Sequence, residues 1–206
     1  MLSSFIPSYQ AHGMSRDVAE DLKIQLSLLL ISLLSISSAI PIGPHHENKS
    51  LAPQLLTTIN DLNTAVIGLT TAVNRFDGSL LSLLPQALAV VKTEAKLDIT
   101  ILKATHIAEK STNFTPEEST NIVNTLAGGI GPIQEFLEVL KKKYPQFTKT
   151  LIAPTVLLDL KILKKHTDDL ITALTPKVTA DNAGLLGLGK GILDQAFDDA
   201  IAVYSA

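Results

Sequence analysis

The chain has 206 residues, enough for one domain with a substantial core. Apolar residues make up 46% of it, but aromatic residues only 4% and there is no Trp, so the core has to be aliphatic, which favours helices packed on helices. The formal charge of −3 argues against a nucleic-acid partner. The lack of Cys excludes disulfides, thiol catalysis and thiolate metal sites.

The N-terminal part of the sequence has the pattern of a secretory signal. Residues 24–36 form an apolar run that is shorter than the roughly 20 residues a membrane span needs. Lys23 precedes this run, and the small residues Ser37, Ser38 and Ala39 follow it. We therefore expect a signal peptide over residues 1–39, with a long first part, and a flexible lead-in over residues 40–50 that contains Pro, Gly and polar groups. A buried helix or an uncleaved signal anchor is the alternative.

The clearest helix is predicted over residues 55–78, because its large apolar residues alternate steps of four and three. These residues are Leu55, Ile59, Leu62, Val66, Leu69, Val73 and Phe76. The residues between them are mostly polar or small, so the opposite face is expected to be exposed, and Gly78 is placed for a left-handed C-cap. Such a helix needs partners of the same kind, because the burial of its apolar face has to offset about 1–2 kcal/mol of backbone entropy per residue.

Four more helical patterns follow. The second runs to about Lys110 and carries two apolar seams, one with Leu84, Leu88 and Leu102 and one with Leu97 and Ile101, which predicts a central, heavily covered helix.

The third helical pattern begins at a capping box formed by Thr115 and Glu118. It passes through Gly128–Pro132 with its seam in phase, which predicts a kinked helix or two short helices nearly in line, and a break at Tyr144–Pro145.

The fourth pattern covers residues 148–175, and the last starts at Asp181 and reaches nearly to the C-terminus. Because the connections are short, residues 51–206 are predicted to form an all-α domain: an antiparallel up-and-down bundle of about five helices, some of them kinked. From the predicted signal peptide we expect a secreted, extracellular protein with no transmembrane segment in its mature form. The last helix is not followed by a polar spacer and an apolar tail, so we expect no lipid anchor.

No catalytic motif stands out, and we expect neither enzymatic activity nor a metal or other cofactor. Residues 184–191 resemble a phosphate-binding loop, but Gly191 replaces the Ser or Thr that would hold magnesium, and no strand precedes them. Asp98 and Thr167 are polar residues on otherwise aliphatic seams, so each is either a candidate contact for a ligand headgroup or a boundary residue displaced by a small drift in helix phase. Asn48 and Asn113 begin glycosylation sequons and are candidate sites if the chain is exported.

Two stretches carry a family resemblance. Asp61–Gly78 (DLNTAVIGLTTAVNRFDG) and Ala180–Ala206 (ADNAGLLGLGKGILDQAFDDAIAVYSA) resemble the first and last helices of the fungal hydrophobic surface-binding protein A family, which includes cell-wall galactomannoproteins. The resemblance implies a small secreted helical bundle without enzymatic activity that adsorbs to hydrophobic surfaces. Relatives among the mannoproteins hold fatty acids between their helices. This chain lacks the Ser/Thr-rich stalk of the anchored mannoproteins, so cell-wall association by covalent attachment is not expected.

Two functions remain open from the sequence. The first is the binding of a fatty acid, another lipid or a hydrophobic surface, in which case we predict that seven residues line the ligand: Leu62, Val66, Leu69, Leu102, Leu137, Ile162 and Phe197. The second is a structural protein of the cell wall or of a host interface, with a packed bundle and no cavity.

Overall fold

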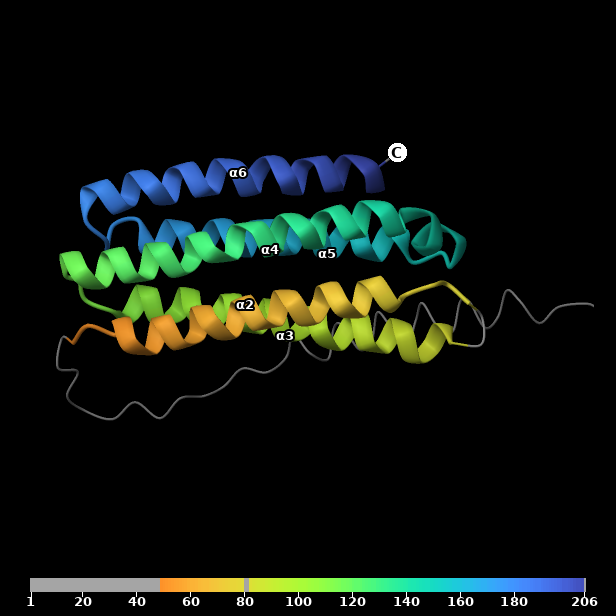
Figure 1. The fold of residues 1–206 in the computed structure, drawn as a ribbon, viewed down its shortest axis with the longest axis horizontal. Coiled ribbons are helices and arrows are strands. Elements are labelled where there is room, and N and C mark those ends of the chain that lie inside the picture. Colours follow the sequence, from red (N-terminus) through yellow and green to blue (C-terminus); the bar gives the residue numbers. More distant parts are fainter. Residues whose placement is uncertain (1–48, 80–81, 206) are drawn as a thin grey trace, which may run out of the picture. The chain divides into compact units, whose positions relative to one another are not determined.

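The computed structural model describes residues 49–79 and 82–205, and over these ranges the chain forms five α-helices and no strand. The helices are α2 (Ala52–Arg75), α3 (Leu83–Lys110), α4 (Pro116–Lys149), α5 (Ala153–Leu174) and α6 (Ala180–Tyr204). Successive helices run in opposite directions and are joined by short connections (Figure 1). The predicted all-α bundle is therefore confirmed. The predicted signal peptide over 1–39, and the lead-in up to residue 48, lie outside the described residues.

The five helices form a closed ring. Helix α2 packs against α3 and α4, helix α6 packs against α4 and α5, and α3 packs against α5, whereas α4 and α5 make few contacts with each other. The ring order is thus α2, α3, α5, α6, α4. Because five is an odd number, neighbours in such a ring cannot all be antiparallel: α2/α4, α4/α6 and α3/α5 are parallel pairs (Figure 1). The antiparallel rule holds along the sequence but not around the ring.

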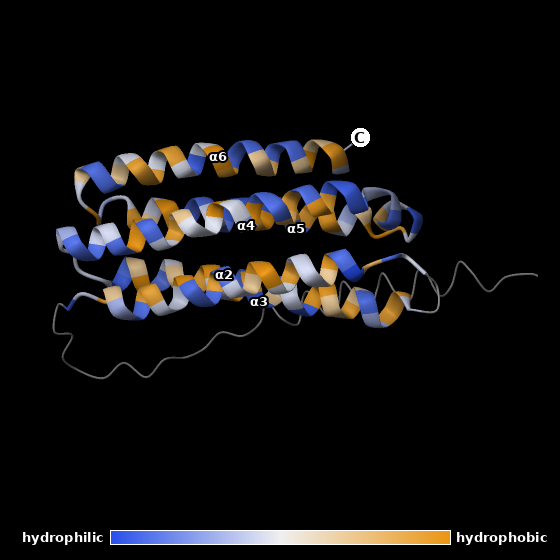
Figure 2. Ribbon diagram, in the orientation of Figure 1, coloured by the Kyte–Doolittle hydropathy of each residue, from blue (hydrophilic) through white to orange (hydrophobic). Residues whose placement is uncertain are grey.

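The predicted seams of the first and last helices are the buried faces of α2 and α6. All seven apolar residues predicted for the first seam are buried, and Leu186, Leu193, Phe197, Ala200 and Tyr204 are the buried residues of α6. Every helix carries both hydrophobic and hydrophilic residues (Figure 2). Gly78 has a positive φ of 71°, as predicted, but it follows the helix, whose C-cap is Phe76.

The prediction of two buried seams on α3 was wrong. Leu97 and Ile101 of the second seam are buried, but Leu84, Leu88 and Leu102 of the first are 62%, 51% and 43% exposed. Helix α3 has two neighbours, α2 and α5. Its buried residues are Ala87, Leu97, Thr100, Ile101, Ala104, Ile107 and Ala108, which include the second seam and leave out the first. One apolar face is enough for both, so the other seam faces solvent.

The third helix extends beyond the break that was predicted at Tyr144–Pro145. Its capping box is present: the Thr115 hydroxyl accepts from the amide of Glu118 at 3.2 Å, and the Thr115 amide donates to Glu118 Oε2 at 2.8 Å. The helix, however, runs through both Pro132 and Pro145 to Lys149. Pro145 removes a donor only near the helix end, and the fully buried Phe147 anchors the final turn by stacking on Phe76 with ring centroids 4.5 Å apart.

None of the helices within the described ranges is long and apolar enough to cross a membrane.

Candidate functional site

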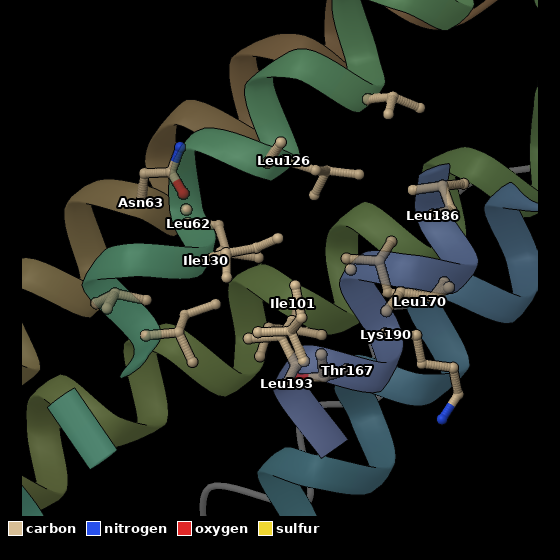
Figure 3. A pocket seen from close by; sticks show the side chains of 18 of the residues that line it. Leu62, Asn63, Ile101, Leu126, Ile130, Thr167, Leu170, Leu186, Lys190 and Leu193 are labelled. Atoms are coloured by element: carbon tan, nitrogen blue, oxygen red, sulfur yellow. The ribbon is translucent and has the colours of Figure 1, made fainter. Parts of the chain in front are cut away.

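A cavity of about 360 Å³ lies inside the ring. Its wall is aliphatic apart from a few polar residues and two Phe, and all five helices contribute to it (Figure 3). Its apolar lining includes Leu62 and Val66 of α2; Leu97 and Ile101 of α3; Val123, Leu126, Ile130, Ile133 and Phe136 of α4; Leu163, Leu170 and Ile171 of α5; and Leu185, Leu186, Leu188, Ile192, Leu193 and Phe197 of α6. Ligand pockets typically measure about 300–1,000 Å³ and are lined by apolar side chains with few polar groups, so the cavity is of the size and character of a binding site.

The cavity exists because no helix crosses the middle of the ring. Helices α4 and α5 face each other across it with few contacts, and aliphatic side chains are too short to fill the space between them. At the end of the bundle where α2, α4 and α6 finish, aromatic rings fill the interior instead. Phe147 stacks on Phe76, and Tyr204 packs on Tyr144 and donates its hydroxyl to the carbonyl of Leu140 at 2.8 Å. This aromatic plug closes that end of the cavity.

The polar residues of the lining are Asn63, Asn124, Thr167 and Lys190. Three of them have partners within the protein. Thr167 Oγ1 donates to the carbonyl of Leu163 at 2.8 Å, and Asn63 Nδ2 donates to the carbonyl of Thr125 at 3.4 Å. Lys190 lies 2.7 Å from a carboxylate oxygen of Asp168 and 2.6 Å from one of Asp194, and these hydrogen bonds raise the pKa of Lys190. Among the described residues, the lining thus includes no His, Ser, Asp or Glu, and its charged group is neutralised by two aspartates.

The structure brings only part of the predicted ligand-lining set to the cavity. Leu62, Val66, Phe197 and Thr167 line it. Leu69 and Leu137 are buried in the packed core outside the lining, Ile162 is half-buried outside it, and Leu102 is largely exposed. For these four residues, ligand contact stays a prediction without support from the geometry.

Several lining residues were not on the predicted list. Ile101 and Leu97 belong to the second seam of α3, whereas the list took Leu102 from the first seam. On α4 the lining includes Leu126, Ile130 and Ile133, which continue the predicted seam of the third helix. The predicted apolar seams were therefore the sequence signal that pointed to the lining residues. The seams do not give the order of the helices around the ring. This order decides which seam residues face the lumen and which face a neighbouring helix.

Asp98 lies outside the cavity, in the α3–α5 contact. Its carboxylate is 2.5 Å from Nδ1 of His166, so an intramolecular partner satisfies it. Glu94 and Asp159 are in the same contact: burial and the charges of Asp159 and Asp98 raise the pKa of Glu94 to about 8, and burial and Asp98 raise that of Asp159 to about 7. The contact between α3 and α5 therefore contains the acidic residues Glu94, Asp98 and Asp159, and it is called here the acidic α3–α5 seam. Asp98 acts there as a contact between helices.

The remaining predicted features are the two sequons and the glycine-rich residues 184–191. Asn113 is exposed in the connection between α3 and α4, next to the buried Phe114, whereas Asn48 lies outside the described residues. Residues 184–191 form two turns of α6. A helix preceded by a loop does not form the strand–loop–helix phosphate site that these glycines resemble.

The chain was compared with known proteins. The family model described as "Hydrophobic surface binding protein A" matches residues 52–176, more than half of the chain. Among solved structures, AfMP4p in complex with palmitic acid is 33% identical, with a TM-score of 0.71 over 74% of this chain and 99% of that one. Ligand binding domain 1 of the Penicillium marneffei MP1 protein, complexed with arachidonic acids, is 13% identical, with a TM-score of 0.67 over 76% of this chain and 98% of that one.

Ligand binding domain 2 of the same protein, also complexed with arachidonic acids, is 15% identical, with a TM-score of 0.64 over 75% of this chain and 95% of that one. No curated protein matches the chain. The MP1 domains show the shared fold, and the family model extends over four of the five helices of the ring, α2 to α5. The chain belongs to the hydrophobic surface binding protein A family.

Proposed function

We propose that the protein binds a long-chain fatty acid, or an apolar ligand of similar shape, in the cavity of the ring, and that it has no catalytic role. The observation that carries this proposal is a cavity of about 360 Å³ walled by aliphatic side chains from all five helices. The 33% identity to a protein crystallised with palmitic acid supports the choice of ligand. A packed structural bundle is the alternative, and the cavity argues against it.

Burial of methylene groups would provide the binding energy. Each buried CH₂ contributes about 0.8 kcal/mol, which corresponds to about a fourfold gain in affinity per carbon. The affinity of a series of saturated fatty acids should therefore rise by about this factor per methylene and level off once the cavity is filled. A series with no dependence on chain length would contradict binding inside the ring.

The direct test is a calorimetric titration of delipidated protein with palmitic acid. A blocked variant, Ile101→Phe with Leu193→Phe, places two larger side chains in the cavity and should lose at least tenfold in affinity, while its melting temperature holds or rises because the space was empty. The matched control, Leu69→Met with Leu137→Met, conserves volume in the packed core outside the lining and should bind within twofold of wild type. Equal affinity in the blocked variant and the wild type would overturn the proposal.

We also propose that the protein is secreted, that it adsorbs to hydrophobic surfaces or associates with the cell wall, and that Asn113 carries a glycan. An apolar run followed by small residues supports export, and the exposure of Asn113 supports modification. Asn113→Gln should lower the mass of the secreted protein by one glycan. This variant is preferable to Thr115→Ala, because Thr115 caps α4 and its loss would also weaken the fold. An unchanged mass would remove Asn113 as a site.

A further inference from the structure

Helix α6 carries an apolar stripe that belongs to the cavity and to the surface at once. Leu185, Leu188 and Ile192 line the cavity, yet they are 53%, 69% and 46% exposed. Their spacing of three and four residues puts them on one side of α6. A second hollow, on the outside of the bundle between α4 and α6, shares Leu188 and Ile192 with the cavity. The interior and the surface are therefore connected through these side chains.

The contact between α4 and α6 is held by polar bonds only near its two ends. At one end Ser119 Oγ accepts from the amide of Thr179 at 3.2 Å, and at the other the Tyr204 hydroxyl donates to the carbonyl of Leu140 at 2.8 Å. Between these bonds, over residues 126–133 of α4 and 185–193 of α6, the described side chains make no hydrogen bond or ion pair across the contact. Separating the helices in this middle stretch breaks only apolar contacts.

The other contact of α6 is different. Lys164 of α5 lies 2.5 Å from a carboxylate oxygen of Asp198, and Lys190 of α6 lies 2.7 Å from one of Asp168. Ion pairs thus cross the middle of the α5–α6 contact. Opening it would separate these charges, whereas opening the α4–α6 contact separates none.

Gly189 brings the α6 backbone close to α4 in the middle of their contact. A Cβ atom at Gly189 would lie 3.3 Å from Cδ1 of Ile130, so a methyl group touches the α6 backbone there. At Gly189, therefore, α6 has no side chain of its own that must move before an acyl chain can pass.

We propose that a fatty acid enters the cavity sideways through the middle of the α4–α6 contact, from an uncharged lipid layer that docks on Leu185, Leu188 and Ile192. The acyl chain then passes from lipid to cavity along apolar side chains without crossing water. The docking layer is uncharged because the nearby cations are already paired and do not attract anionic headgroups: Lys190 is paired with Asp168 and Asp194. On the rim of the outer hollow, Glu138 is paired with Lys141, and Asp199 adds a negative charge. This inference rests on the proposed binding of an acyl chain.

The first test measures the association rate of a fluorescent fatty acid transferred from phosphatidylcholine vesicles. Leu188→Gln with Ile192→Gln should slow association at least tenfold. Leu84→Gln with Leu88→Gln, which changes two residues of similar exposure on α3 away from the cavity, should stay within twofold of wild type. An unchanged association rate in the α6 variant, or an equal loss in both variants, would overturn the docking surface whatever happens to the equilibrium affinity.

The second test locks one contact at a time. The chain has no Cys, so introduced cysteines are its only thiols. Ile130→Cys with Gly189→Cys places a pair across the α4–α6 contact, and Lys164→Cys with Asp198→Cys places a pair across the α5–α6 contact. With each pair joined by a short, reducible thiol linker, uptake should slow at least tenfold in the α4–α6 lock, recover on reduction, and change less than twofold in the α5–α6 lock.

The reverse pattern, or equal slowing in both locks, would overturn the proposed entrance. Failure of the wild-type protein to take up any fatty acid would instead remove the proposed function, and the entrance with it. The two failures are distinguished by the equilibrium titration of the unlocked protein.

Discussion

The two halves of the bundle are packed differently. Where α2, α4 and α6 end, Phe76, Phe147 and Tyr204 fill the interior, and both Phe rings are fully buried. Towards the other end the same helices surround a cavity of about 360 Å³. The aromatic end, called here the solid half, is filled by rings. The rest of the bundle, called here the hollow half, contains the cavity, although residues such as Leu55 and Leu174 are packed beyond it. Four of the chain's few aromatic residues, Phe76, Tyr144, Phe147 and Tyr204, thus gather at one end.

The largest expected effect compares the same truncation in the two halves. Phe147→Ala should lower the free energy of unfolding by about 3–5 kcal/mol, because it leaves a new void in the solid half. Phe197→Ala, at a residue that is also buried but borders the cavity, should cost about 2 kcal/mol, since a ring beside a void already lacks contacts on one side. Urea unfolding measures both values. Equal losses would mean that the cavity is closed in solution.

The second prediction concerns the cavity wall at two adjacent glycines. A Cβ atom at Gly129 would lie 2.4 Å from Oδ1 of Asn63, so Gly129→Ala should force the Asn63 side chain out of its hydrogen bond with the carbonyl of Thr125 and cost about 1–3 kcal/mol. A Cβ atom at Gly128 would meet nothing within 4 Å, so Gly128→Ala should stabilise α4 by about 0.5–1 kcal/mol through lower backbone entropy in the unfolded chain. Thermal unfolding of the two variants should therefore shift in opposite directions. A shift of the same sign would show that the α2–α4 contact adapts.

The third prediction concerns the acidic α3–α5 seam. Burial raises the pKa of Glu94 from its ordinary value of 4.5 to about 8, so between these pH values the native state holds a proton that the unfolded chain releases. The free energy of unfolding should consequently fall as the pH rises from about 4 to about 8. Glu94→Gln removes the ionisable group, so the variant should be more stable than wild type by about 1–2 kcal/mol at pH 8, and the difference should shrink towards pH 4. Equal pH dependence in the two proteins would contradict a raised pKa at Glu94.

The smallest expected effect concerns the cap of α4. Thr115→Ala removes the hydroxyl that accepts from the amide of Glu118 and should cost about 1 kcal/mol. Thr120→Ala provides the control, because the Thr120 hydroxyl is exposed and donates mainly to the carbonyl of Pro116 within the same helix. Its unfolding free energy should change by less than about 0.5 kcal/mol. A loss at Thr120 as large as that at Thr115 would show that the capping box adds no stability of its own.

The sequence predicted local structure better than the arrangement of the helices. The seams of α2 and α6 and the start of α4 at Thr115 follow from helical periodicity and capping chemistry, which are local. The predicted break at Pro145 was wrong. The local cost of a proline inside a helix is outweighed there by the burial of Phe147 against Phe76, and these two residues are far apart in the sequence. The choice of Leu102 over Ile101 failed for the same kind of reason. Which seam of α3 faces the lumen depends on the ring order, and no single helix encodes that order.

The central claim is that a guest chain lies inside the ring. A crystal structure with a fatty acid brominated at its terminal carbon tests it most directly, because the anomalous signal locates the bromine independently of the protein. We expect the bromine to lie among Ile101, Leu170 and Leu193, enclosed by all five helices. A bromine found only on the outer surface of the bundle, with the cavity empty or closed, would contradict it.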